Sequence, residues 1–428
     1  MTYEEAVAFL DARIGYGRRP GLDRIRGVLD IMADPHLLYP VVQIAGTNGK
    51  TSTTLMTAAV LNALGIRCGS YTSPHLHAPE ERFAMDGSTM TSTEFATAVA
   101  DVKPLVELYE ERTGTGITYF ELATAVAYAW FAERTAGAAA VEVGLGGRWD
   151  ATSVVQPEVA VITSIALDHQ EYLGGTLAEI AAEKAAIVPS GGVLVSGPLP
   201  LEAVRPVAER VEHMSAEWHR MGDSFDVTAD RPAVGGHMFD IDGLYGSYRD
   251  VYLRMHGAHQ AVNFTISVAA AEAVVGRELA PASVAAAAAA VHVPGRLEIV
   301  GREPLLVLDG AHNPGGSTVL ARALDEELPD LRWSAVVGLT GPRDPAVFLG
   351  PLAPLLHRVV AVEPLSSHAV PAAAVAAAAA GFGLESAVGA GGAGEVHRLA
   401  AELGDGEGIL VTGSLYLVGE VRHAIVGG

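Results

Sequence analysis

The sequence predicts an α/β protein in which a large N-terminal domain and a smaller C-terminal domain are each built on a parallel sheet. Short apolar segments of strand length alternate with longer helical segments, an alternation typical of parallel sheets covered by helices on both faces. The chain has 428 residues, enough for two or three domains with cores of their own. A Pro-Gly pair at 294–295 follows an Ala-rich helical segment, so we expect the domains at 1–293 and 294–428.

The predicted strands are short apolar runs, and the predicted helices between them are rich in helix-forming residues. One helical pattern begins directly after the first strand, and two others are runs of alanine. The strands are predicted at 41–45, 138–144, 159–166, 305–309, 334–339, 358–363 and 409–414, and these three helices at 52–64, 285–290 and 372–380.

Composition excludes several classes of function. The formal net charge of −22 argues against nucleic acid or anionic membrane as a partner, because both are polyanions. The single cysteine, Cys68, excludes an intrachain disulfide and a cysteine-based zinc site. The first residues lack the apolar stretch of a signal peptide, and the apolar helical stretch at 122–132 is shorter than the ~20 residues of a membrane span. We expect a cytoplasmic monomer that acts on small molecules.

The strongest motif is the loop Gly46 to Ser52 (GTNGKTS), which follows a predicted strand and begins a helix. Backbone N–H groups at such a helix start hold phosphates, with Lys50 neutralising their charge and Thr51 within reach of Mg²⁺. The usual spacing would place a glycine at position 44, which is Ile44, so this is a shorter variant. The alternative is a glycine-rich turn with a solvated lysine. Because lysine stands at only three positions among 28 basic residues, we predict a nucleoside triphosphate site.

Two further strands of the first domain end in candidate metal ligands. Glu142 lies near the end of one predicted strand, and Asp168 and His169 follow the next. Ligands of open parallel sheets bind beyond the carboxyl ends of the strands, so these side chains are expected near the phosphate loop. For His169 alone, a capping or core histidine is the competing interpretation. A buried Glu142 without a function would be costly, which favours a role for it.

Two other polar segments have both a functional and an ordinary interpretation. Lys184 lies in a helical segment, where a surface lysine paired with Glu179 or Glu183 is the ordinary one. In the second domain a strand is followed by the polar residues Asp309, His312 and Asn313, which would otherwise form a solvated turn.

Ten segments carry a resemblance to a known family: GTNGKTST (46–53), SPHL (73–76), TYFELAT (118–124), EVGLGGRWDAT (142–152), TSIALDHQEYLG (163–174), AAEKA (181–185), HQAVN (259–263), GRLE (295–298), LDGAHNPGG (308–316) and VTGSLYLVGEVR (411–422). Taken in order over nearly the whole chain, they resemble the folylpolyglutamate synthase/dihydrofolate synthase family of the Mur ligase superfamily. The resemblance implies a P-loop ATPase-type N-terminal domain with a pteroate site and a Rossmann-like C-terminal glutamate ligase domain. The phosphate loop begins too early for the separate UDP-binding domain of cell-wall Mur ligases.

The resemblance also implies roles for single residues, with ATP and Mg²⁺ as cofactors and a monovalent cation as a further candidate. Lys184 matches a lysine that the family carbamylates, and Lys50, Lys184, Asp309 and His312 are the predicted catalytic residues. The predicted ATP-binding residues are Gly46, Thr47, Asn48, Gly49, Lys50, Thr51, Ser52, Asn263, Arg296 and Asp309. The predicted metal ligands are Thr51, Ser73, Glu142 and His169. The predicted substrate residues are Thr72, Thr118, Tyr119, Phe120, Glu121, Trp149 and Ala151 for the pteroate, and His312 and Ser414 for the incoming glutamate.

The predicted function is an ATP-dependent amide ligase that adds L-glutamate to a folate, to dihydropteroate or to both, through an acyl phosphate and with release of ADP and phosphate. The alternative is a paralogous ligase that joins an amino acid to a non-folate aromatic acid. Two departures from the family leave room for it: Arg343-Asp344 replaces a Lys-Asp pair, and Trp149 replaces a smaller aliphatic residue. A nucleotide-switch protein is a third reading, against which stands the lack of an Asn-Lys-x-Asp guanine-reading motif.

Overall fold

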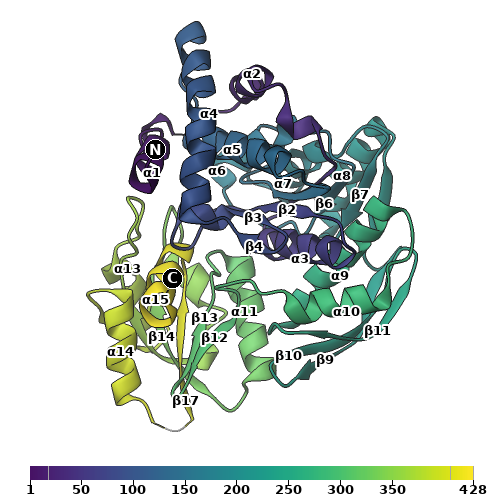
Figure 1. The fold of residues 1–428 in the computed structure, drawn as a ribbon. Helices are drawn as coiled ribbons and strands as arrows, with labels where there is room; N and C mark the ends of the chain where they lie inside the picture. The colour runs from purple at the N-terminus through teal and green to yellow at the C-terminus, as the bar shows by residue number, and fades with distance from the viewer. Residues whose placement is uncertain (18, 405, 428) are drawn as a thin grey trace.

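The computed structural model describes residues 1–17, 19–404 and 406–427, and within them the strands form three sheets (Figure 1). The largest has eight strands in the order β4-β3-β2-β5-β1-β6-β7-β8. Six of its strands, in the order β2-β5-β1-β6-β7-β8, are parallel, whereas β3 and β4 form an antiparallel edge. The strands are β1 (Val41–Ala45), β2 (Cys68–Tyr71), β3 (Phe83–Met85), β4 (Ser88–Thr89), β5 (Ala138–Glu142), β6 (Val159–Ile162), β7 (Val193–Ser196) and β8 (Glu217–Arg220).

Helices cover both faces of this sheet, as the alternation of segments predicts. Alternate residues of each strand pack on opposite faces, so Val42 of β1 joins one core and Val41 the other. One face carries α3 (Lys50–Ala63), α9 (Ala258–Val275) and α10 (Pro281–Ala290). The other carries α4 (Ser92–Thr113), α5 (Tyr119–Glu133), α7 (Leu177–Lys184) and α8 (Leu201–Met214), with α1 (Tyr3–Asp11) and α2 (Asp23–Ile31) packed outside α4.

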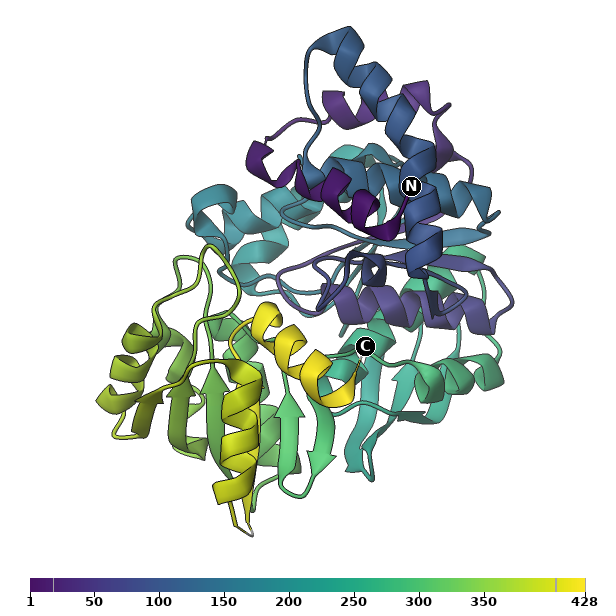
Figure 2. The same ribbon diagram turned by 60° about the vertical axis from the view of Figure 1, so that its left-hand side comes forward.

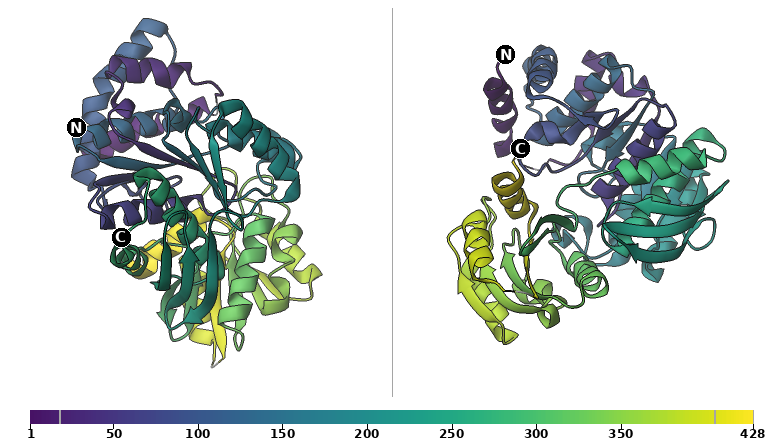
Figure 3. Two further views of the ribbon diagram at one scale, coloured as in Figure 1. Left: turned by 90° about the vertical axis from the view of Figure 1, so that its right-hand side faces the viewer. Right: turned by 60° about the horizontal axis from the view of Figure 1, so that its bottom comes forward.

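A three-stranded antiparallel sheet, which the sequence did not predict, packs against α9 and α10. Its strands are β9 (Asp226–Ala233), β10 (Gly236–Asp242) and β11 (Ser247–Leu253). Both views in Figure 3 place this teal sheet on the outside of the N-terminal domain, on the side of the C-terminal domain. Residues 258–263, which include the segment HQAVN, form the start of α9.

The third sheet forms the C-terminal domain, with strand order β12-β13-β17-β14-β15-β16 and only the edge strand β12 antiparallel. Its strands are β12 (Glu298–Arg302), β13 (Leu305–Leu308), β14 (Arg332–Val337), β15 (Leu356–Ala361), β16 (Glu385–Val388) and β17 (Glu407–Thr412). Helices α11 (Pro314–Glu327), α12 (Pro345–Leu349) and α13 (Ala372–Gly381) cover one face, and α14 (Gly392–Glu402) and α15 (Leu415–Val426) the other.

The two α/β domains meet so that the carboxyl ends of their strands face each other. In Figure 2 the yellow helix α15 lies where the C-terminal domain approaches the N-terminal one. A Cβ at Gly419 of α15 would lie 2.0 Å from the carbonyl oxygen of Leu76, so the backbones are in direct contact there. The fold class is confirmed as α/β with a large, mostly parallel domain and a smaller one. The boundary at 293/294 stays a prediction, and it falls between α10 and β12.

Candidate active site

The loop from Gly46 to Ser52 joins β1 to α3 and lines a cavity between the two domains. Lys50 begins α3, and its Nζ donates to the carbonyl of Thr47 at 3.1 Å. Thr163 and Ser164, just beyond β6, fix the loop from behind by donating to the carbonyl of Asn48 at 2.6 and 3.0 Å. The first N–H groups of a helix have no partner within it, so this loop presents donors suited to phosphate oxygens.

Glycine is required at two positions of this loop because side chains from other parts of the protein approach its backbone closely. A Cβ at Gly46 would lie 1.8 Å from the Thr163 hydroxyl. One at Gly49 would lie 2.6 Å from Oδ1 of Asn263, and Gly49 also has a φ of +84°. Asn263 belongs to α9, so the glycine brings a distant helix against the phosphate loop, at the position where an ATP contact is predicted.

Glu142 lies at the end of β5 with its side chain almost fully buried beside the loop. Its two carboxylate oxygens each accept a hydrogen bond from the Thr51 hydroxyl at 3.1 Å, and one accepts from the backbone N–H of Ser73 at 3.1 Å. Burial raises the pKa of the Glu142 carboxyl, and the positive charge of Lys50 opposes this. Glu142 and Thr51 therefore lie side by side, as expected for two ligands of one metal ion. Both offer oxygen atoms, the ligands that Mg²⁺ prefers.

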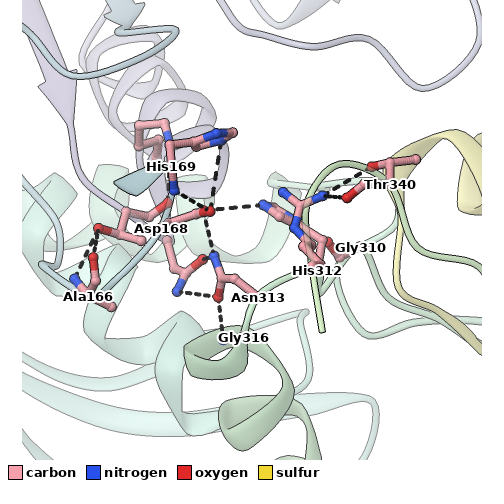
Figure 4. Close-up of polar contacts among 12 residues, drawn as sticks. Ala166, Asp168, His169, Gly310, His312, Asn313, Gly316 and Thr340 are labelled. Atoms are coloured by element: carbon pink, nitrogen blue, oxygen red, sulfur yellow. Dashed lines mark hydrogen bonds and ion pairs between the residues drawn. The ribbon is translucent and has the colours of Figure 1, made fainter. Parts of the chain in front are cut away.

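His169 lines the same cavity as that pair. Its ring is 39% exposed and lies 3.9 Å from Oδ1 of Asp168 (Figure 4). Burial lowers the pKa of His169. Among the described residues, no three His, Cys, Asp or Glu side chains form a metal cluster. Because Mg²⁺ usually combines one or two carboxylates with water and substrate phosphates, Glu142 and Thr51 fit this ion, and a role for His169 stays a prediction.

Lys184 lies at the end of α7, 3% exposed, and donates from Nζ to the carbonyl of Gly46 at 2.8 Å. Burial, reinforced by the charge of Lys50, lowers the pKa of Lys184 to about 7. The ordinary interpretation of a surface ion pair does not hold, since Glu183 pairs with Arg148 at 2.8 Å and Glu179 caps α7.

The C-terminal domain contributes Arg296, Asp309 and His312 to the cavity. The Asp309 carboxylate accepts from the N–H groups of Leu297 and Ala311, both at 2.8 Å. Burial raises the pKa of Asp309, and Arg296 opposes this. Burial also lowers the pKa of His312 to about 4, and its Nδ1 lies 2.8 Å from the carbonyl of Gly310. A neutral ring that donates from Nδ1 leaves Nε2 able to accept a proton.

Asn313 joins the two domains across the cavity, a role that the sequence did not indicate. Its side chain exchanges hydrogen bonds with that of Asn48 at 3.0 and 3.3 Å and donates to Oδ2 of Asp168 at 2.9 Å (Figure 4). His259 and Gln260 of α9 also line the cavity and were missed as single candidates. The polar residues at the helical spacing 259, 260 and 263 are the signal in the sequence that could have identified this helix face.

The predicted pteroate residues lie outside this cavity, and several already have structural partners. Thr118 caps α5, and Glu121 accepts from Arg24 at 3.0 Å. The Phe120 ring lies 6.1 Å from that of Tyr71 and against Gly144, which lines the cavity. Of the remaining residues, Thr72 and Ala151 are buried, Tyr119 is half-buried and Trp149 is 56% exposed.

Two C-terminal positions singled out from the sequence make hydrogen bonds within their own domain. Ser414 is buried and caps α15 by accepting from the N–H of Tyr416 at 3.1 Å. Arg343, in the loop that departs from the family, donates to the carbonyl and the hydroxyl of Thr340 (Figure 4).

The cavity has a volume of about 470 Å³, and both domains line it. All the predicted nucleotide and metal residues are among its lining residues, as are Lys184 and His312. No helix in the described part of the chain has the length and apolarity that crossing a membrane requires.

Comparison with known proteins gives matches to both domains. Residues 44–271 match the Mur ligase middle domain, and residues 295–415 match the Mur ligase glutamate ligase domain. A dihydrofolate synthase/folylpolyglutamate synthase of Mycobacterium tuberculosis is 38% identical over 84% of this chain and 77% of its own length. A solved Mycobacterium tuberculosis folylpolyglutamate synthase with ADP and AMPPCP has a TM-score of 0.92 at 35% identity over 99% of both chains. An FPGS–AMPPCP–folate complex has a TM-score of 0.87 at 31% identity over 100% of both chains.

Proposed function

The chain belongs to the Mur ligase family and, within it, to the folylpolyglutamate synthase/dihydrofolate synthase group, and from this premise we propose a reaction for the cavity. The protein is an ATP-dependent acid–amino acid ligase that adds glutamate to folates. One observation carries the proposal for its residues: the phosphate loop of one domain and Arg296, Asp309 and His312 of the other line a single cavity. A ligation of three anionic reactants needs such a site, where cations and donors converge.

In the first step a substrate carboxylate attacks the γ-phosphate of ATP, which gives an acyl phosphate and ADP. The N–H groups of the loop and the Lys50 ammonium stabilise the charge that develops on the phosphate oxygens. Glu142 and Thr51 would hold Mg²⁺, which supplies further neutralisation of the phosphates when it is bound. Arg296, whose charge reaches both Asp309 and Glu142, adds a cation from the C-terminal domain.

In the second step the amine of glutamate attacks the acyl phosphate, the amide forms and phosphate leaves. The amine must lose protons to become a nucleophile and to complete the amide. His312 is suited to accept one, because burial keeps the ring neutral at pH 7. Its Nε2 lies 3.8 Å from Oδ2 of Asp168, which would stabilise the imidazolium once the proton has been taken. Closure of the two domains over the bound reactants would exclude water that hydrolyses the acyl phosphate.

We further propose that a pterin ring lies beside Phe120, on the far side of Gly144 from the phosphate loop. An aromatic ring contributes apolar contact area and favours offset stacking on a flat heterocycle. Phe120 already lies near Tyr71 with ring planes 27° apart, so the pterin would stack on the face of Phe120 that Tyr71 does not cover. The carboxylate of such an acid would extend past Gly144 toward the nucleotide.

The test is an acceptor panel of dihydropteroate, tetrahydrofolate and a non-pterin aromatic acid, each incubated with MgATP and L-glutamate and read by mass spectrometry. We expect the pterin acids to gain glutamate with stoichiometric ADP. A product from the non-pterin acid alone would replace the proposal with the paralogous ligase. Hydrolysis of ATP that needs neither an acid nor an amine would contradict the proposed ligase reaction.

A further inference from the structure

The C-terminal end of α11 is anchored in the N-terminal domain by a buried carboxylate that the reaction itself does not use. Glu327 is the last residue of α11, and its side chain is 6% exposed. It lies 2.9 Å from Nε2 of His237 on β10 and 2.6 Å from Nδ1 of His256, and it accepts from the N–H of Gly257. Three groups of one domain therefore converge on one carboxylate of the other.

The geometry requires a charged imidazole at the centre of this group. His237 is 3% exposed, and its second ring nitrogen lies 2.8 Å from Oδ1 of Asp230. A carboxylate only accepts hydrogen bonds, so both nitrogens of His237 donate and the ring is an imidazolium. The carboxylates of Asp230 and Glu327 thus hold a cation between β9, β10 and α11. We call Asp230, His237, His256 and Glu327 the interdomain ion cluster.

Helix α11 is thereby attached to the N-terminal domain at both ends. At its start, Asn313 bonds to Asn48 of the phosphate loop and to Asp168. At its end, Glu327 bonds to the interdomain ion cluster. A helix of this length spans roughly 20 Å, so the two attachments fix the orientation of the domains and not only their contact.

The same carboxylate positions the first turn of α9, which lines the nucleotide cavity. Gly257 is the residue before α9 and has a φ of +95°, and a Cβ there would lie 2.3 Å from the His259 ring. His259 and Asn263 follow on the cavity side of this helix. The bonds of Glu327 to His256 and Gly257 therefore fix the backbone from which these two side chains extend.

We propose that Glu327 is a positioning residue for the ligation reaction: it ties the first turn of α9 and the C-terminal end of α11 together, and so holds the two domains in the arrangement that completes the nucleotide cavity. This inference rests on the proposed function for its kinetic readout but not for its binding readout. Stability alone is a weaker explanation, because well-packed apolar residues stabilise such a contact at least as well as a buried ion pair. The ion cluster instead selects one defined arrangement of the two domains.

The kinetic consequence separates positioning from chemistry. If loss of the tie lowers the population of the arrangement that binds nucleotide, the apparent affinity falls by that fraction. Saturating MgATP draws the protein back to the binding arrangement, so kcat is retained. Because hydrogen bonds to a buried charged group are lost, we expect the KM for MgATP to rise about ten- to a hundredfold.

The experiment compares Glu327→Gln with Glu326→Gln, its neighbour on α11, which pairs with Arg322 at the surface. We measure KM and kcat for MgATP and the Kd of AMPPCP by calorimetry. Glu327→Gln should raise both KM and Kd about ten- to a hundredfold with kcat near the wild-type value, and Glu326→Gln should change neither. A Glu327→Gln protein with wild-type KM and Kd, or one that loses kcat at unchanged KM, would overturn the inference.

A second pair of variants covers the case in which Glu327→Gln does not fold. His256→Ala removes one donor to Glu327, whereas the amide of His256→Asn places a donor near the position of Nδ1. We expect a raised Kd for AMPPCP in the first and recovery in the second, and an equal Kd in both would contradict the proposal. If the wild type makes no amide, the proposed function fails, but the AMPPCP titrations still decide the role of Glu327.

Discussion

Replacement of Lys184 by arginine tests whether this lysine works as a charge or as an amine. Its Nζ contacts the Gly46 carbonyl and lines the cavity with Lys50 and His169. An arginine would keep the positive charge but cannot readily react with carbon dioxide. If Lys184 is carbamylated, as proposed from the family, Lys184→Arg should lose nearly as much activity as Lys184→Ala. Lys103→Arg on α4, a half-buried lysine that pairs with Glu107 and does not line the cavity, is the matched control and should stay active.

The magnitude follows from the burial of the amine. With its pKa lowered to about 7, half of Lys184 is neutral at pH 7. An ordinary lysine is neutral in only about one molecule in several thousand at that pH, so burial enriches the reactive form by about 10³-fold. Below pH 7 the amine becomes protonated, and activity should fall with it. The product carries a negative charge in place of a positive one, next to Lys50 and the phosphates.

The assay combines turnover with ¹³C NMR of protein equilibrated in ¹³C-bicarbonate. A carbamate signal should appear in the wild type and vanish in both Lys184 variants. Removal of carbon dioxide should lower the rate, bicarbonate should restore it, and a small carboxylic acid should partly rescue Lys184→Ala. Full activity of Lys184→Arg, or an active wild type without the carbamate signal, would refute this reasoning.

Three further predictions concern the phosphate loop, the metal and the interdomain ion cluster. Lys50→Ala should lower kcat by about 10³-fold or more with an unchanged melting temperature, and a coupled assay should detect ADP; release of pyrophosphate would contradict the role of the loop. Glu142→Ala should abolish Mg²⁺-dependent turnover and His169→Ala should weaken it, as read from the rate against Mg²⁺ concentration; an unchanged Mg²⁺ dependence in Glu142→Ala would exclude that carboxylate. Burial lowers the pKa of His237, but its bonds to carboxylates outweigh this and raise it to about 9. Its contribution to stability should therefore be complete below pH 6.5 and be lost as the pH rises through about 9. Denaturant unfolding of the wild type should show that loss while Glu327→Gln shows less of it, and equal pH slopes would be evidence against the ion cluster.

Features encoded within a few neighbouring residues could be predicted from the sequence. The strands at 41–45 and 305–309 are mostly apolar because both faces of each sheet are covered, and the structure has them as β1 and β13 with nearly the same ends. The phosphate loop could be identified because its glycines and Lys50 are adjacent in the chain. The predicted strands 138–144 and 159–166 end earlier, and their last residues turn into the cavity.

Features that depend on distant residues could not be predicted. Strand β9 is largely exposed, so it lacks the alternating apolar pattern of a half-buried strand, and the antiparallel sheet was missed. Asn48 and Asn313 are 265 positions apart, and His237 and Glu327 are 90 apart. Polar side chains of this kind look like surface residues in a sequence, and only the docking of the domains buries them.

The central claim is that the cavity transfers the γ-phosphate of ATP to a substrate carboxylate before the amide forms. The most direct measurement follows ¹⁸O from the labelled carboxylate of the acid acceptor during one turnover with MgATP and L-glutamate. The account predicts that each phosphate released carries one ¹⁸O atom and that the nucleotide product is unlabelled ADP. Phosphate without the label, or ¹⁸O in AMP, would contradict the account.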